Sequence, residues 1–366
     1  MNTIPNNVLA FAGEANKSAY EKFQDYFRHY RALNGEKVSY SDEADFATKE
    51  AKMNETLKAE VERISGVSFS TEINEAVLAS NPQVVWATFA VIGAMIDAVL
   101  PETMIDSVGM YTDVRFGGFG DSFAFDVSPR DLFVVSKHGR AKRHAEVHKQ
   151  FKGQVTIIPE LREITTQVSL YKVLAGKESL ADFVMRCIRS IETQMSVDCY
   201  TAFNTAMTAL PTTPVNGELK ATGYDQTTLV EFAQRVSAWN GGARAIIVGT
   251  QLALQNILPA DANYRYDLQS DYVKVGYIRT AFGYDIMSLP QVADWKEPFK
   301  LALDNNRLYI VSPGAQKIIK LCIEGSTLSN VDGTFANANL TQNATIMKFW
   351  GTGVATNAVA AMIEIA

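Results

Sequence analysis

The side chains best suited to chemistry are concentrated in one basic segment, residues 137–152 (KHGRAKRHAEVHKQFK). This segment holds three of the four histidines of the chain and a single acid, Glu146. His144 and His148 stand at i and i+4, a spacing that places two metal ligands on one helix face. The surrounding positive charge opposes a bound cation. A pH-sensitive protein contact is therefore a stronger expectation than a metal site, and an ordinary solvated loop is stronger still.

Two glycine-containing segments have a partial likeness to nucleotide-binding loops. A dinucleotide fingerprint that includes Gly118 and Gly120 needs a further glycine three residues on, where Phe123 stands. Lys177 follows a glycine as in a phosphate-binding loop, but the glycine required at position 171 is Tyr171. Neither segment meets the requirements of its motif, so no nucleotide cofactor is expected.

The chain also lacks the patterns of the common enzyme classes. No G-x-S-x-G motif is present, and histidines occur only at position 29 and between 138 and 148, which leaves no serine–histidine–aspartate arrangement. Cys187, Cys199 and Cys322 form no CxxC pair, which indicates free buried thiols in a reducing compartment. We therefore expect no enzyme, and no catalytic, cofactor or metal residues. The net charge of −6 argues against a general nucleic-acid-wrapping surface.

The first 65 residues are more charged than the rest, with 20 charged residues of 65 against 54 of the remaining 301. Apolar residues at helical spacing predict helices over 16–33 and 42–64, and Asn34-Gly35 and Ser65-Gly66 mark their ends. Both helices have richly charged outer faces. They are therefore expected to form a surface appendage rather than the centre of the fold.

One apolar segment, residues 84–100 (VVWATFAVIGAMIDAVL), is nearly long enough to cross a membrane. It contains Asp97, and no positive residue flanks it, so a buried helix is expected instead. Residues 1–11 have no basic region followed by an apolar run, which predicts that the chain stays in the cytoplasm where it is made.

The segment 121–173 has the pattern of a long two-stranded hairpin with the basic segment at its tip. Alternation at Phe123, Phe125 and Val127 indicates one side, with a further strand-like run at 132–135. The strand 155–158 and the alternating run 164–170 indicate the other side. Because an isolated two-stranded hairpin is marginally stable in water, something else must cover it.

A long helix follows, with Ser179 as its N-cap and apolar residues at spacings of three and four as far as Met207. At about 1.5 Å per residue this spine helix is about 43 Å long. An α/β region comes next, and strands close the chain. The expected elements are helices over 226–239 and 251–258, and strands over 243–249, 273–277, 284–289, 301–302, 308–311, 318–324 and 344–350, with a last apolar run over 355–365.

The order of these elements resembles the major capsid protein of tailed bacteriophages, whose fold is named after bacteriophage Hong Kong 97. The resemblance covers about residues 70–366 and rests on the turn at 117–120, the basic segment, the spine helix and the closing strands. It implies an α+β fold. The implied parts are a scaffold-like helical extension (1–66), an N-arm with glycine-rich turn (67–120), an E-loop hairpin (121–175), a P-domain spine helix (176–210), an A-domain (211–317) and P-domain closing strands (318–366).

The resemblance further implies pentamers and hexamers that tile an icosahedral virion shell around double-stranded DNA, assembled in the host cytoplasm. Scaffold, portal and decoration proteins are candidate partners, and no membrane is involved. A hairpin that its own chain does not cover should lie on a neighbouring subunit, and its basic tip should meet an acidic patch there. The expected tip contacts are Lys137, His138, Arg140, Lys142, Arg143, His144, His148, Lys149 and Lys152. A polar loop expected near the symmetry axes contains Tyr264, Arg265, Tyr266 and Asp267.

Two alternatives stay open at this point. A cellular shell of the encapsulin type would share the fold and enclose cargo enzymes instead of DNA. A metal-dependent enzyme built on the hairpin histidines belongs to a different class, and stoichiometric bound metal would identify it.

Overall fold

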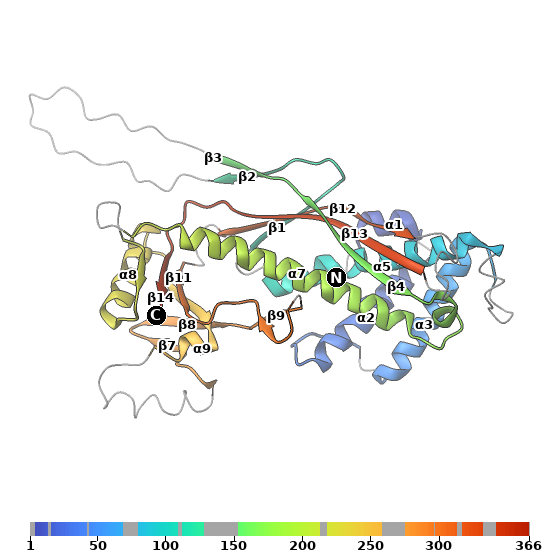
Figure 1. The fold of residues 1–366 in the computed structure, drawn as a ribbon, viewed down its shortest axis with the longest axis horizontal. Helices are drawn as coiled ribbons and strands as arrows, with labels where there is room; N and C mark the ends of the chain where they lie inside the picture. The colour runs from blue at the N-terminus through green and yellow to red at the C-terminus, as the bar shows by residue number, and fades with distance from the viewer. Residues whose placement is uncertain are drawn as a thin grey trace, which may run out of the picture.

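The computed structural model describes residues 4–13, 16–41, 44–68, 80–108, 112–127, 153–212, 218–257, 275–295, 297–312, 317–331 and 342–365. The body is elongated along one long helix, α7 (Leu180–Thr208), which crosses the centre of Figure 1. N-terminal helices lie at one end of this helix and a six-stranded sheet with its own helices lies at the other. A two-stranded ribbon projects from the body between them.

A four-stranded sheet runs beside the long helix in the order β1-β12-β13-β4. β1 is parallel to β12, while β12–β13 and β13–β4 are antiparallel pairs. Helices α5 and α7 pack on one face of this sheet and form a single core with it. The elements are β1 (Thr112–Gly117), β4 (Glu160–Val168), β12 (Ile319–Val331), β13 (Gln342–Val354) and α5 (Pro82–Val108).

The first six residues of β12 are buried without alternation, because both faces of the strand are covered there. Ile319, Leu321 and Ile323 belong to the core made with the helices. Cys322, one position out of phase, belongs to a separate cluster on the opposite face. Successive side chains of a strand point to opposite faces, so this half of β12 packs against the helices on one face and against a second cluster on the other.

The expectation that the N-terminal helices form a surface appendage is wrong. The helices predicted there exist, as α2 (Lys17–Leu33) and α3 (Phe46–Ser65), preceded by α1 (Asn6–Ala12). Their apolar stripes pack on α5 and α7, and Tyr20, Phe23 and Leu57 are fully buried. The Gln24 amide also donates to the Ala98 carbonyl of α5 at 2.7 Å. Because α5 is apolar on all sides, it needs this cover on the face that the sheet leaves open.

Among the described residues, helix α5 is long and apolar enough to cross a membrane, over Pro82–Thr103. It lies inside the protein, between the N-terminal helices, α7 and the four-stranded sheet, and most of its side chains are buried. The expectation of a buried core helix is confirmed for this segment.

The spine helix α7 begins where the sequence predicts. The Ser179 hydroxyl accepts a hydrogen bond from the Asp182 amide at 3.2 Å, which satisfies one free N–H of the first turn. Asn54 of α3 supplies a second cap, because its side-chain oxygen accepts the Ala181 amide at 3.0 Å. An N-terminal helix thus completes the start of the spine helix.

The second sheet has six strands in the order β5-β14-β11-β6-β8-β7. It forms its own apolar core with α8 and α9. The predicted strand at 273–277 is wrong in its described part, because residues 275–277 contain no strand. The elements are β5 (Lys220–Thr222), α8 (Gln226–Trp239), β6 (Ile246–Thr250), α9 (Gln251–Leu254), β7 (Thr280–Ala281), β8 (Tyr284–Leu289), β11 (Arg307–Val311) and β14 (Ala361–Glu364).

The predicted hairpin is correct at its base and differs beyond it. β2 (Phe123–Val127) pairs with β3 (Gly153–Ile157) as an antiparallel ribbon, here called the stem. The alternating run after β3 does not continue this ribbon. It forms β4 and pairs with β13 along its whole length. Alternation predicts which residues share a face of a strand but not which strand it pairs with, so the sequence did not distinguish the two arrangements.

Candidate functional site

The stem lies across the four-stranded sheet, on the face opposite the helices. Phe123, Phe125 and Ile157 pack against Cys322 of β12 and Ala355. The approach is close, since a Cβ atom added to Gly351 would lie 2.7 Å from the Ile158 carbonyl oxygen. Only the absence of a side chain in β13 at this position allows the stem backbone to come so near.

Two cations hold the innermost ring of the stem. Phe125 is fully buried, and the guanidinium of Arg115 lies 4.2 Å from its ring centroid, with the Lys320 ammonium 5.6 Å from it. Lys320 is itself buried and pairs with Asp113 at 3.2 Å. Arg115 also donates to the Ala124 carbonyl at 2.7 Å. The stem is therefore fixed to β1 and β12 by cation–π and hydrogen-bond contacts as well as by apolar packing.

The glycine-rich segment 117–120 is the turn through which the chain enters the stem. Gly120 has a φ of +85°, a region that glycine adopts without steric cost, and its amide donates to the Glu324 carboxylate of β12. Phe119 contacts Phe349 edge to face, with ring centroids 5.6 Å apart, yet stays largely exposed. The segment thus has a structural role in the turn.

Around the base of the stem, several large apolar side chains remain exposed. Ile158, just after β3, is 78% exposed, and the stem projects away from the body in Figure 1. The described part of the chain covers these side chains only in part. The exposed set is Phe116, Phe119, Val155, Ile158 and Leu161. We call this set the stem surface.

A buried ion pair lies on the other face of the sheet. Lys348 of β13 is 2.8 Å from the Asp97 carboxylate of α5, and both side chains are about 95% buried. Asp97 also accepts the Thr327 amide at 2.8 Å and the Thr327 hydroxyl at 2.6 Å. Thr327 lies where the register of β12 shifts, between Glu324 and Leu328. This pair therefore fixes an irregular point of β12, three residues from the carboxylate that receives the Gly120 amide.

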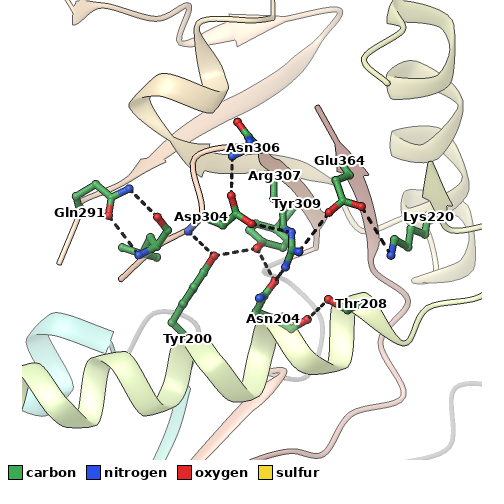
Figure 2. A network of polar contacts seen from close by, with 11 residues as sticks. Tyr200, Asn204, Thr208, Lys220, Gln291, Asp304, Asn306, Arg307, Tyr309 and Glu364 are labelled. Carbon is green, nitrogen blue, oxygen red and sulfur yellow. Dashed lines mark hydrogen bonds and ion pairs between the residues drawn. The ribbon is translucent and has the colours of Figure 1, made fainter. Parts of the chain in front are cut away.

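A second polar network, shown in Figure 2, joins the spine helix to the six-stranded sheet. Arg307 of β11 pairs with Asp304 at 3.1 Å and with Glu364 of β14 at 3.2 Å, and also donates to the Asn204 side chain of α7. The Asn204 oxygen accepts the Tyr309 hydroxyl as well, at 3.1 Å. We call this network the spine joint.

Tyr200 completes the spine joint one helical turn away from Asn204. Its hydroxyl lies 3.2 Å from the Tyr309 hydroxyl and accepts the Asp304 amide at 2.8 Å. Burial raises the pKa of the Tyr309 hydroxyl, so this group remains protonated and available as a donor. The joint fixes the orientation of the six-stranded sheet on the last turns of α7.

Comparison with known proteins places this architecture. No protein-family model matches the chain, and no curated protein is similar to it in sequence. Among solved structures, the capsid of a native GTA particle matches with a TM-score of 0.50 at 12% identity, over 72% of this chain and 90% of that chain. The chain has the fold of this capsid protein. At 12% identity this similarity establishes the fold.

Two further solved structures are similar to this capsid fold. The capsid of an empty GTA particle gives a TM-score of 0.46 at 13% identity, over 71% of this chain and 89% of that chain. The capsid of the cyanophage P-SCSP1u gives 0.45 at 12% identity, over 70% and 86%. The match to the native GTA particle, at a TM-score of 0.50, confirms the α+β capsid fold expected from the order of elements.

The predicted contact residues of the capsid fold lie outside the described residues. This holds for the tip set, Lys137, His138, Arg140, Lys142, Arg143, His144, His148, Lys149 and Lys152, and for the loop set, Tyr264, Arg265, Tyr266 and Asp267. The described stem ends at the pair Val127 and Gly153, so the basic segment joins the two strands at that end. Both sets therefore stay predictions.

Sequence reasoning missed the residues that hold the stem in place. Arg115 and Lys320 are 205 positions apart, and nothing in either local sequence indicates that they meet over Phe125. Asp97 did give a signal, because it is the single charge in an otherwise apolar segment. A charge that is buried requires a partner, and Lys348 provides it.

Proposed function

We propose that this chain is a structural subunit of an icosahedral viral shell, which assembles with copies of itself and encloses double-stranded DNA. The capsid fold supports this proposal, and the stem surface is the observation that carries it. A two-stranded ribbon whose described residues pack on one face alone, with Ile158 and Leu161 exposed beside it, is not a stable end point for an isolated chain. Neighbouring copies would supply the missing cover.

The basic segment 137–152 extends this proposal to electrostatics. The chain as a whole has a net charge of −6, so a basic tip on one copy would meet a mostly acidic surface on the next. The polar loop with Tyr264, Arg265, Tyr266 and Asp267 would meet its own copies around the five-fold and six-fold axes of pentamers and hexamers. Each contact can be weak, because a subunit bound to several neighbours gains from all of them together.

The role proposed for the chain is mechanical rather than enzymatic. An acidic shell does not bind the phosphates of the enclosed DNA tightly, which suits dense packing and later release. The N-terminal helices would serve as a permanent part of the subunit, since they supply the cover of α5.

The test is expression of the full chain, with electron microscopy of the particles and reversal of the charges at the tip. We expect wild-type shells, and no shells from the triple variant R140E/K142E/R143E, whose circular dichroism and thermal unfolding stay those of the wild type. The matched control K52E/K177E/R186E changes the net charge equally at exposed positions of the helical end and should still assemble.

Failure of the wild-type chain to form any particle would contradict the shell proposal. Particles from the tip variant would contradict the role of the tip alone. Nucleic acid that copurifies with nuclease-treated particles would favour a virion shell, and enclosed protein without nucleic acid would favour the encapsulin alternative.

A further inference from the structure

The segment between β8 and β11 carries aromatic side chains that are exposed rather than packed in a core. Two short strands in this segment, β9 (Ala293–Asp294) and β10 (Lys300–Leu301), pair antiparallel. We call its described residues, 293–295 and 297–301, the arm. Trp295 is 85% exposed and Phe299 is fully exposed. Leu301 adds a third exposed apolar side chain beside them.

The backbone at Phe299 makes this exposure unfavourable for an isolated chain. Its φ of +62° lies in the left-handed region, which costs a bulky residue free energy that glycine would not lose. Among the described residues, Phe282 is the other non-glycine residue with positive φ, at +54°, and it packs against the core of the six-stranded sheet. Packing against the core offsets the free-energy cost of the strained backbone at Phe282, whereas Phe299 has no such contact within the described chain.

The arm is held rigidly at its base. The Gln291 amide donates to the Leu303 carbonyl at 3.0 Å and to the Asn305 side chain at 2.6 Å, and the Leu303 amide donates back to Gln291 at 3.3 Å. Asp304, which follows Leu303 in the chain, belongs to the spine joint (Figure 2). The aromatic side chains therefore project from a fixed base, and a partner would bind them with little loss of conformational freedom.

The charges of the arm indicate the kind of partner. The Lys300 ammonium is 2.9 Å from the Glu297 carboxylate and 3.8 Å from that of Asp294, so its charge is already compensated. A nucleic acid or an anionic membrane needs an excess of cations, whereas the sequence of segment 293–301 balances two bases, Lys296 and Lys300, with two acids, Asp294 and Glu297. An exposed tryptophan and phenylalanine on a charge-compensated support fit an apolar protein surface.

The arm also borders a groove on the helix side of the four-stranded sheet. Trp295 forms one wall of this groove, whose other sides are Ile164 of β4, Gln194 and Val197 of α7, and Trp350 of β13. The stem packs on the opposite face of the sheet, so the arm is an exposed apolar surface separate from the stem contact. In a closed shell each subunit contacts several copies, so different neighbours would cover the stem surface and the arm.

We propose that the arm is a contact between subunits, in which Trp295 and Phe299 of one copy insert into an apolar surface of a second copy of this chain. This inference rests on the proposed shell function and assigns a specific contact to it. The residue identities at the arm are then explained by the assembled state, in which the strained Phe299 becomes buried.

The first experiment separates stability from assembly. F299G relieves the backbone strain, so the thermal midpoint of the unassembled chain should equal or exceed that of the wild type. The concentration at which half of the chain enters shells should rise at least tenfold. W295A should give the same result. The control F282G should instead lower the thermal midpoint, and W239A, which truncates a similarly exposed tryptophan at the end of α8, should assemble normally.

Assembly of F299G and W295A at the wild-type concentration would overturn the arm contact. An equal loss in W239A would also overturn it, because the effect would then belong to exposed tryptophans in general. If the wild-type chain forms no shells, the proposed function itself fails. The arm is then tested by dimer formation in sedimentation at high concentration, where W295A and F299G must weaken a wild-type dimer for the contact to stand.

The second experiment identifies the occupant directly. The three native cysteines are buried, so F299C provides a thiol that can be labelled selectively with a photo-crosslinker. Shells are assembled from an equal mixture of ¹⁵N-labelled and unlabelled chains and then irradiated. Crosslinked peptides that combine both isotopes are expected. Crosslinks confined to one isotope, or crosslinks only to another protein, would show that the arm does not bind a second copy.

Discussion

The Lys348 ammonium of β13 and the Asp97 carboxylate of α5 lie 2.8 Å apart in the interior, between the sheet and an otherwise apolar helix. Removal of either partner leaves the other as an uncompensated buried charge. We therefore expect D97N and K348M each to lower the free energy of unfolding by about 3–5 kcal/mol. The double variant D97N/K348M should lose clearly less than the sum of the two.

Urea unfolding of all four chains in a double-mutant cycle measures this coupling. The matched control is K320M, because Lys320 is equally buried but its partner Asp113 is partly exposed to water. Strictly additive effects of D97N and K348M would show that the pair does not act as a unit.

The contact of the stem with β13 depends on Gly351. A methyl group at this position would lie 2.7 Å from a backbone oxygen that has little room to move. We expect G351A to destabilise the chain by about 1–3 kcal/mol by forcing the stem outward. In G153A the added Cβ would meet only Val127, at an ordinary 3.7 Å, so its unfolding midpoint should change little. Equal midpoints for the two variants would contradict this description of the stem contact.

The N-terminal helices should be required for folding. A chain that begins at residue 80 would expose the apolar face of α5, and we expect it to aggregate on expression. The point variant L57A tests the same packing more mildly and should cost about 2–5 kcal/mol, because Leu57 is fully buried. E55A, on the exposed face of the same helix, should be neutral. A soluble, cooperatively folding truncated chain would restore the view of these helices as an appendage.

The buried thiols make the free energy of unfolding depend on pH in the alkaline range. Burial raises the pKa of Cys322 from 9.0 to about 11. From pH 9 upward the unfolded chain therefore loses this proton before the folded chain does, and stability falls as pH rises toward 11. Well below pH 9 the thiol is protonated in both the folded and the unfolded chain, so it adds no pH dependence to the free energy of unfolding. Urea unfolding at pH 8, 9.5 and 11 should show a smaller loss for C322A than for the wild type, and identical slopes would contradict the shifted pKa.

The sequence was informative where the signal is local. Helix α7 was predicted at its observed start because Ser179 is a cap and the apolar spacing is regular over its whole length. β1 was missed because its six residues lie between segments rich in glycine and show no clean alternation. Its partner β12 is some 200 residues away, and a parallel pairing of this kind leaves no trace in either segment.

For the candidate site, the sequence indicated properties of segments but not their partners. It indicated that the N-terminal helices have apolar stripes and that the segment of α5 is a buried apolar helix, yet it did not indicate that the two pack on each other. It also gave no sign of the aromatic arm, because Trp295 and Phe299 are ordinary apolar residues until their exposure is known. Exposure is a property of the folded chain, so this surface could be found only from the structure.

The spine joint has a mechanical consequence. Helix α7 is fastened near its start by Asn54 and on its last turns by Tyr200 and Asn204, so the long axis of the subunit has few ways to flex. Under the proposed function the same subunit would occupy both pentamers and hexamers, which differ in curvature. Because the stem is also fixed to the sheet, a subunit this stiff would adapt through its contacts with neighbouring copies rather than by bending its body.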